Sequence, residues 1–306
     1  MSENGRMFNA EPDPLRDWLR DVPPDRPVLI AGPTASGKSA LAMALAMAQG
    51  RTVVNADALQ VYACWRVLTA RPSPEDEAAV PHRLYGHVAA GQPYSVGHWL
   101  REVAQVLATD PRPVIVGGTG LYFSALTEGL ADIPPTPPEV RARADARLAA
   151  EGAAALLAEL DPATLARIDR LNPARIQRAW EVQAATGQGL AAWQDRTGPP
   201  LLPLGQAHAL VLRPDPGWLG ARIDRRFAGM IAAGALEEVR AMLPHWAPAQ
   251  PWARAIGAPE LVAHLRGETT LDQALAAACT ATRRYAKRQR TWMRNRLRPW
   301  PALSLP

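Results

Sequence analysis

Short apolar segments alternate with longer helical segments through the first part of the chain, and another apolar segment follows near residue 209. Residues 28–31 (VLIA) predict a buried strand, and the Ala-, Leu- and Met-rich residues 39–49 have high helix propensity. Further strands are predicted at residues 52–57, 113–118 and 209–212. Strands that alternate with helices favour a parallel α/β sheet with right-handed crossovers, which binds ligands at the carboxyl ends of its strands.

Two stiff breaks separate a segment of different composition from the rest of the chain. Residues 134–138 (PPTPP) form the first break and residues 198–200 (GPP) the second. Between them Ala, Arg, Leu and Glu recur with helical spacing, which predicts an all-helical insertion. The expected organisation is a flexible N-terminal extension, a core in two segments and the insertion: residues 1–22, residues 23–135 with 205–306, and residues 136–204.

Composition narrows the class of protein. Hydrophobic residues make up 48% of the 306 positions, which is enough to bury a sizeable core. The chain has no run of about eighteen apolar residues, and residues 1–21 lack the apolar stretch of a secretory signal, so neither a membrane partner nor export is expected. Cys64 and Cys279 are too few and too far apart for a zinc site or a disulfide framework. We therefore expect a cytoplasmic protein.

The charge of the chain permits a polyanionic partner without demanding one. The formal net charge is +5 and the pI is about 9.7. Of the 34 basic residues only Lys38 and Lys287 are lysines, and both lie inside motifs discussed below, which indicates that these two places need an ammonium. At Lys38 the reason is physical, because a compact point charge fits a phosphate loop that a planar guanidinium would overfill.

A phosphate-binding motif follows the first predicted strand and opens the first predicted helix. Glycines in this motif let successive backbone N–H groups point into one cavity, and the helix N-terminus makes the cavity more positive. Lys38 is expected to neutralise terminal phosphate oxygens, and the hydroxyl of Ser39 to help hold Mg²⁺, the expected cofactor. The motif G-x-x-x-x-G-K-[ST] is matched by Gly32, Pro33, Thr34, Ala35, Ser36, Gly37, Lys38 and Ser39. The predicted fold is thus a P-loop NTPase-like parallel sheet flanked by helices, with the helical insertion.

Asp57 ends the second predicted strand, which brings its carboxylate near the phosphate loop. In a kinase this carboxylate would hold a metal ion or deprotonate an acceptor hydroxyl, and in a transferase it would deprotonate an acceptor amine. A structural alternative is a helix N-cap. The residues alone leave these alternatives open.

At this point the sequence resembles a known family, the tRNA dimethylallyltransferases, also called tRNA isopentenyltransferases or IPP transferases. The resemblance runs from about residue 27 to residue 300. Its markers occur in the family's order: residues 32–39 (GPTASGKS), 57–62 (DALQVY), 69–72 (TARP), 81–84 (PHRL), 116–122 (VGGTGLY), 139–143 (EVRAR), 175–179 (RIQRA), 255–257 (AIG), 282–283 (TR) and 287–292 (KRQRTW). The sequence departs from the family's pattern at Ala58, at Leu68 and at Ala258-Pro259.

The resemblance implies an activity. A dimethylallyl group would pass from dimethylallyl diphosphate to N6 of the adenosine at position 37 of tRNAs that read codons beginning with U, and diphosphate would leave. Asp57 would be the general base, Thr119 would lie in the reaction channel, and Lys38 would act on the diphosphate. The helical insertion would grip the anticodon stem-loop of the tRNA, and the protein would act as a monomer.

The resemblance also implies the residues that contact tRNA. They lie at the second strand, in the insertion and late in the chain. The implied residues are Asp57, Ala58, Leu59, Gln60, Thr119, Arg141, Ala174, Arg175, Ile176, Gln177, Arg178, Arg254, Ala255, Ile256, Gly257, Lys287, Arg288, Gln289, Arg290, Thr291, Trp292, Met293 and Arg294.

Charge patterning near the C-terminus agrees with an RNA substrate. A helix is expected at about residues 271–297, and no acid follows residue 273. One stripe of this helix is basic and could contact phosphates, whereas a solubilising helix usually mixes both signs. The basic stripe is Arg283, Lys287, Arg290 and Arg294, and a separate stripe expected to face the core is Leu271, Leu275, Ala278, Thr282, Tyr285 and Trp292. Arg226, on a helix expected at about residues 220–243, is a candidate for charge at the leaving group, with a solvated helix face as the alternative.

Three other functions share part of this pattern. A small-molecule P-loop kinase would use the same loop and Asp57, but it leaves the basic tail and the insertion without a purpose. An adenylate isopentenyltransferase would prenylate free AMP or ADP and would need no anticodon grip. A non-catalytic P-loop RNA-binding module would not need both Asp57 and Thr119.

Overall fold

The computed structural model describes residues 14–305, which form two compact units. One unit contains the chain up to Thr127 and from Leu202 onward, and the other contains Glu128–Leu201. Within the described residues, no helix combines the length and apolar character that crossing a membrane requires. Each unit is described separately below.

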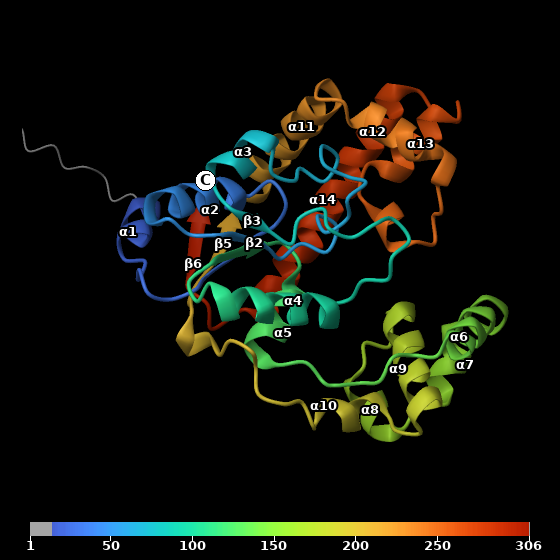
Figure 1. Ribbon diagram of the computed structural model, residues 1–306. Coiled ribbons are helices and arrows are strands. Elements are labelled where there is room, and N and C mark those ends of the chain that lie inside the picture. The colour runs from blue at the N-terminus through green and yellow to red at the C-terminus, as the bar shows by residue number, and fades with distance from the viewer. Residues whose placement is uncertain (1–13, 306) are drawn as a thin grey trace, which may run out of the picture. The chain divides into compact units, whose positions relative to one another are not determined.

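The larger unit is built on a six-stranded parallel sheet with the order β3-β2-β4-β1-β5-β6 (Figure 1). The strands are β1 Val28–Ala31, β2 Val53–Asn55, β3 His82–Arg83, β4 Val114–Gly117, β5 His208–Pro214 and β6 Ala302–Leu305. The four predicted strands and the parallel α/β class are confirmed. The edge strands β3 and β6 were not predicted. β3 has only two residues, and β6 is a short terminal segment next to a proline, so neither shows a clear hydrophobic periodicity.

Helices cover both faces of the sheet because alternate strand residues point to opposite faces. Leu29 and Ala31 pack with α4, α5 and the end of α14, whereas Val28 and Ile30 pack with α2. Figure 1 shows α2 on one side of the sheet and α4 and α5 on the other. The helices of this unit are α1 Pro14–Arg20, α2 Lys38–Gln49, α3 Pro74–Ala79, α4 Val96–Thr109, α5 Gly120–Glu128, α11 Pro216–Ala232, α12 Ala235–Met242, α13 Ala258–Leu265 and α14 Leu271–Arg296.

The start of the described chain differs from the flexible extension expected over residues 1–22. Residues 1–13 lie outside the described residues. Pro14–Arg20 is a helix, and its Leu15, Trp18 and Leu19 pack against the core cluster that contains Val22. Burial of these apolar side chains lowers the free energy of the folded chain, whereas a flexible extension would leave them in water. The expected flexible extension is therefore wrong for residues 14–22.

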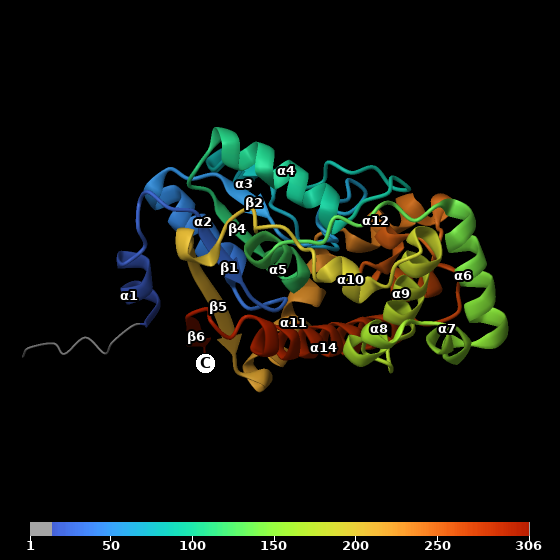
Figure 2. The same cartoon turned by 90° about the horizontal axis from the view of Figure 1, so that it is seen from below.

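The smaller unit is all-helical, and Figure 2 gives a second view of its helices. They are α6 Pro138–Glu151, α7 Ala153–Ala158, α8 Pro162–Arg167, α9 Pro173–Thr186 and α10 Leu190–Gln194. The unit has its own core, in which Val140 and Ala144 of α6 meet Ile176 and Trp180 of α9.

The limits of the helical unit, 128 and 201, lie before the predicted limits of 136 and 204. The segments that enter and leave this unit pack against each other. Gly129 has φ +98°, and a Cβ there would lie 2.6 Å from the carbonyl oxygen of Gly198. Both stiff breaks, residues 134–138 and 198–200, lie inside the helical unit. The chain therefore enters this unit before the first break.

Candidate active site

The phosphate loop, residues 32–39, connects β1 to α2 at the carboxyl edge of the sheet. Ala35 and Gly37 have φ of 62° and 90°, which is the left-handed backbone that curls such a loop. Ser36 is buried, and its Oγ has no hydrogen-bond partner among the described residues. A buried hydroxyl without a hydrogen-bond partner costs free energy, and a bound phosphate oxygen could supply that partner. The loop is therefore suited to receive phosphate oxygens.

Side chains from two distant helices fix the phosphate loop. Arg222 of α11 donates from Nε to the carbonyl oxygen of Ala35 at 2.9 Å. Gln289 of α14 accepts from the N–H of Thr34 at 2.9 Å and donates to the carbonyl oxygen of Gly118 at 2.9 Å. Gln289 is only 6% exposed. It therefore ties the loop to the end of β4, and its contact with tRNA stays a prediction.

Lys38 lies at the first position of α2, where its Nζ donates to the carbonyl oxygen of Pro33 at 3.2 Å. Burial lowers the pKa of Lys38 to about 8, the nearby Asp57 opposes this change, and Arg226 adds to it. An anion bound in the loop would restore the charged form by direct attraction. The structure therefore brings the Lys38 ammonium into the electrostatic field of both Asp57 and Arg226, as the predicted site requires.

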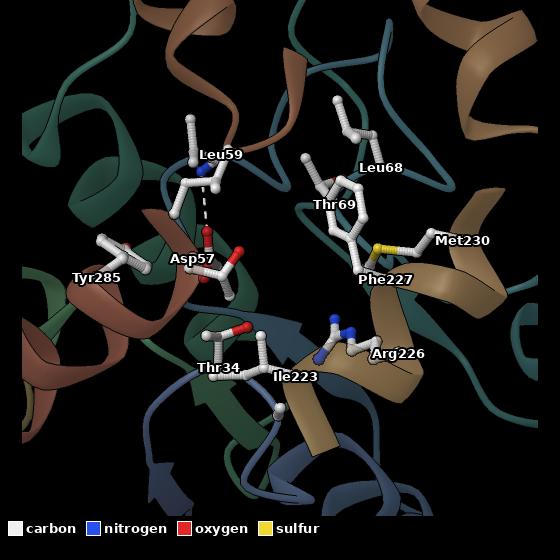
Figure 3. Close-up of a pocket in the computed structure, with 13 residues that line it drawn as sticks. Thr34, Asp57, Leu59, Leu68, Thr69, Ile223, Arg226, Phe227, Met230 and Tyr285 are labelled. Atoms are coloured by element: carbon white, nitrogen blue, oxygen red, sulfur yellow. Dashed lines mark hydrogen bonds between the residues drawn. The ribbon is translucent and has the colours of Figure 1, made fainter. Parts of the chain in front are cut away.

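Asp57 follows β2 and sits in a tight turn. Its N–H donates to Oδ1 of Asn55 at 2.8 Å, and its own Oδ1 accepts from the N–H of Leu59 at 3.0 Å (Figure 3). Asn55 is fully buried and also donates to the carbonyl oxygens of Asp57 and Leu84. One carboxylate oxygen thus holds the turn, and no helix begins here, so the N-cap alternative does not apply.

Thr119 follows β4 and contacts the same turn. Its Oγ1 accepts from the N–H of Ala58 at 2.9 Å, and its N–H donates to the carbonyl oxygen of Ala56 at 3.2 Å. Thr119 does not line the pocket described below, whereas Asp57 does. The hydroxyl therefore positions the residues after Asp57 in this structure, and its expected place in the reaction channel stays a prediction.

Two glycines after β4 let α14 approach the site. A Cβ at Gly118 would overlap the amide of Gln289, and a Cβ at Gly120 would overlap the ring of Trp292. Any larger residue would push α14 away from the phosphate loop. Residues 116–122, a marker of the family resemblance, thus have a packing role in addition to any contact with substrate.

A pocket with a volume of about 610 Å³, including its open mouth, lies beside the phosphate loop. Thr34 and Ala35 of the loop, Asp57 and Arg226 supply its polar wall, and most of the remaining wall is apolar (Figure 3). The lining residues are Thr34, Ala35, Asp57, Leu59, Leu68, Thr69, Ile223, Arg226, Phe227, Met230, Ile256, Thr282 and Tyr285. Such a pocket can hold an anionic group at one end and a hydrocarbon group at the other.

Two ionisable side chains of this pocket are affected by burial. Burial lowers the pKa of Arg226, and the neighbouring Asp57 opposes this change. Burial and then Asp57 raise the pKa of Tyr285, which keeps its phenol neutral. The proposed place of Arg226 at the leaving group agrees with its position on the pocket wall, and the alternative of a solvated helix face is excluded.

Several residues predicted to contact tRNA hold a loop, line the pocket or pack in a hydrophobic core. Gln60 donates from Nε2 to the carbonyl oxygens of Thr69 and Ala70 at 2.8 and 2.9 Å, so its amide holds a loop. Leu59 and Ile256 line the pocket. The side chains of Ile176, Ala255 and Met293 pack in hydrophobic cores, and Gly257 is also buried. Contacts with tRNA from these four positions stay predictions.

Helix α14 carries the predicted basic residues on its exposed side. Lys287 and Arg294 are exposed, Arg290 is half-buried, and none of the three forms an ion pair within residues 14–305. Arg283 differs, because it forms an ion pair with Asp224 of α11. The late predicted segments contain four further residues. Arg254, Arg288 and Thr291 are exposed, and Trp292 is half-buried.

Most of the predicted core stripe of α14 faces the core. Ala278 is fully buried, and Leu271, Leu275 and Trp292 are partly buried against the hydrophobic cores. Thr282 and Tyr285 of the same stripe line the pocket. The apolar pattern alone gave no sign of this pocket.

Predicted tRNA residues also gather in the helical unit around Glu181, which is 1% exposed. Arg141 of α6 forms an ion pair with Glu181 at 3.0 Å, and Arg178 of α9 lies 3.7 Å from the same carboxylate. Gln177 donates to Glu181 at 3.1 Å. Ala174 and Arg175 are exposed at the start of α9. The burial of Glu181 was not predicted, because a single acid in a charged helix gives no sign that it is buried.

Comparisons with known proteins agree with this site. Residues 60–296 match the family described as IPP transferase, and residues 26–87 match isopentenyl transferase. A tRNA dimethylallyltransferase of Cereibacter sphaeroides is 70% identical over 299 residues, which cover 98% of this chain and 95% of the relative. The full-length tRNA isopentenylpyrophosphate transferase of Bacillus halodurans has a similar structure, with a TM-score of 0.64 and 28% identity over 92% of this chain and 90% of that one. A eukaryotic dimethylallyltransferase acting on tRNA shares the fold, with a TM-score of 0.77 and 23% identity over 91% of this chain and 73% of that one. The chain therefore belongs to the IPP transferase family.

Proposed function

We propose that this protein transfers a dimethylallyl group from dimethylallyl diphosphate to N6 of the adenosine at position 37 of tRNAs that read codons beginning with U. In this proposal it acts as a cytoplasmic monomer. The observation that carries the proposal is the pocket itself, in which a phosphate loop and Asp57 border a largely apolar cavity. A small-molecule P-loop kinase with a polar acceptor would gain nothing from that hydrocarbon surface beside the phosphate loop.

The reaction breaks the bond between C1 of the dimethylallyl group and the bridging oxygen of the diphosphate. The electron pair of this bond leaves with the diphosphate, whose growing charge is balanced by the N–H groups of the phosphate loop, by Lys38 and by Arg226. A bond forms between C1 and N6 of adenosine, and the carboxylate of Asp57 accepts the proton that N6 loses. The products are N6-isopentenyladenosine in the tRNA and diphosphate.

A magnesium ion fits this arrangement through Ser39. The Ser39 hydroxyl is exposed at the first turn of α2, directly after Lys38. No cluster of three or more His, Cys, Asp or Glu side chains able to hold a metal ion occurs among residues 14–305. Mg²⁺ commonly binds with few protein ligands and completes its shell with substrate phosphates and water. When bound, it would supply positive charge to the leaving diphosphate.

The tRNA is held by charges outside the pocket. Adenosine in a loop must leave its stack to reach Asp57, which costs a few kcal/mol. Lys287, Arg290 and Arg294 of α14, which form no ion pair within residues 14–305, offset this cost through phosphate contacts. Arg141 and Arg178 of the helical unit contact the anticodon stem-loop. Free AMP would need neither set of charges, so neither supports an adenylate isopentenyltransferase.

The test uses purified protein, unmodified tRNA and radiolabelled dimethylallyl diphosphate with Mg²⁺ and without ATP. We expect label in a tRNA that reads a codon beginning with U, and none in the same tRNA with guanosine at position 37. Label in free AMP instead of tRNA would favour the adenylate enzyme. Transfer of the γ-phosphate of ATP to a small acceptor, without prenyl transfer, would overturn the proposal in favour of a kinase.

A further inference from the structure

Leu68, Phe227 and Met230 form one apolar wall of the pocket (Figure 3). Leu68 comes from the loop after β2, and the other two come from α11. Leu68 and Phe227 are each only 4% exposed, so their side chains belong to the packed interior as well as to the pocket. In Figure 3 Leu68 lies apart from Thr34 and Arg226, which mark the end for the diphosphate, and Phe227 lies between Leu68 and Arg226.

The backbone that carries Leu68 is fixed by one carboxylate. Glu238 of α12 accepts from the N–H of Leu68 at 2.8 Å, from the N–H of Val67 at 3.1 Å and from the N–H of Arg66. Hydrogen bonds to a charged acceptor are stronger than neutral ones, and three successive donors on one acid leave the loop little freedom. The position of Leu68 in the wall is therefore set by α12.

The side chain of Leu68 also has no space behind it. Gly257 has φ +97°, and a Cβ there would lie 2.8 Å from the ring of Phe227 and 2.9 Å from Cδ1 of Leu68. The backbone at Gly257 thus touches the rear of the wall. Because protein interiors are close-packed and resist insertion of extra carbon atoms, Leu68 cannot retreat to enlarge the pocket.

From this geometry we propose that Leu68 limits the length of the prenyl group, so that the five-carbon dimethylallyl donor is accepted and the ten-carbon geranyl donor is rejected. The inference rests on the proposed function, because it assumes that a prenyl diphosphate occupies the pocket. With the diphosphate held at the phosphate loop, the second isoprene unit of a geranyl chain would, in this proposal, meet the wall that contains Leu68. The same bonds form and break with either donor, and only the fit of the hydrocarbon differs.

The experiment compares Leu68→Ala and Leu68→Val with the wild type. For each protein, kcat/KM is measured with dimethylallyl and with geranyl diphosphate, at saturating tRNA, and the modified nucleoside is identified by its mass. We expect the geranyl-to-dimethylallyl ratio to rise about ten- to a hundredfold in Leu68→Ala, the scale on which small apolar differences are discriminated. Leu68→Val, which disturbs packing less, moves the ratio in the same direction by a smaller factor.

Leu265→Ala is the matched control. Leu265 of α13 packs on the same hydrophobic cluster as Leu68 but does not line the pocket, so this variant leaves the ratio at its wild-type value. Thermal unfolding shows that the variants compared are folded. If folded Leu68→Ala and Leu68→Val keep a ratio within about twofold of the wild type, or lose both donors equally, the length limit is wrong. Failure of the wild type to use dimethylallyl diphosphate would instead refute the proposed function.

Discussion

The two carboxylate oxygens of Asp57 are placed in different surroundings. Oδ1 accepts from the N–H of Leu59 and stabilises the turn after β2. The side chain also lines the pocket, within the field of Lys38. One residue therefore combines a structural hydrogen bond with a place at the reacting group, and the two duties can be separated by a substitution that keeps the shape and removes the charge.

Asp57→Asn is expected to lower kcat by at least about a hundredfold, because an amide cannot accept the proton that N6 loses. An asparagine oxygen can still accept from the N–H of Leu59, so the turn should remain. Single-turnover kinetics and tRNA binding, measured on the same preparation, check both parts. A parallel loss of turnover and of tRNA affinity would show that Asp57 is a binding residue.

Lys38 should make donor binding depend on pH. Its pKa is lowered by burial to about 8, so the free protein carries the ammonium below this pH and loses it above. Affinity for dimethylallyl diphosphate should therefore weaken above pH 8, by at most about tenfold per pH unit. Calorimetry at several pH values measures the affinity, and it should also detect proton uptake on binding above pH 8. Lys38→Met carries no ammonium, so a bend near pH 8 in the weaker binding of this variant would assign the bend to another group.

At the scale of elements, α14 connects the site with the molecular surface. Gln289 on its buried side fixes Thr34 and Gly118, while Lys287, Arg290 and Arg294 lie on other sides. A helix turns about 100° per residue, so adjacent positions can serve a buried site and a surface partner. This explains how one continuous segment, residues 287–294, contains both packing residues and candidate phosphate contacts.

Arg290→Ala is expected to weaken tRNA binding and to flatten its dependence on salt. One phosphate contact fewer should reduce the slope of log K against log salt by somewhat less than about one unit. Binding titrations at several salt concentrations give this slope. Arg240→Ala on α12 is a suitable comparison, because Arg240 is paired with Glu237 at 3.5 Å. An unchanged slope in Arg290→Ala would remove this residue from the phosphate contacts.

At the scale of the whole molecule, the two compact units have separate hydrophobic cores. The sheet and its helices build the pocket, whereas the helical unit packs around Ile176 and Trp180 and gathers Arg141 and Arg178 at Glu181. Separate cores allow a surface residue of one unit to be changed without disturbing the packing of the other.

Arg141→Ala is therefore expected to raise the Kd for tRNA severalfold and to leave the Kd for dimethylallyl diphosphate unchanged. The reason is that Arg141 lies in the helical unit, outside the unit that forms the pocket. Arg167→Ala, which breaks an exposed ion pair with Asp195 in the same helical unit, serves as the control. Equal weakening of donor and tRNA binding in Arg141→Ala would contradict this division of tasks.

The sequence by itself determined the features that depend on neighbouring residues. The strand at 28–31, the phosphate loop and the basic C-terminal helix, which has no acid after residue 273, are each encoded in one continuous segment, because hydrogen bonding and side-chain periodicity act locally. The order of short motifs was enough to identify the family.

Only the tertiary structure decided how distant segments meet. Gln289 reaches Thr34, Glu238 holds the backbone at Leu68, and Glu181 is buried between two arginines. Each of these polar residues is satisfied by partners far away in the chain or on another helix, and such pairing leaves no local pattern. Burial of Ile176, Gln289 and Met293 was likewise decided by tertiary structure, since which face of a helix is covered depends on what packs against it.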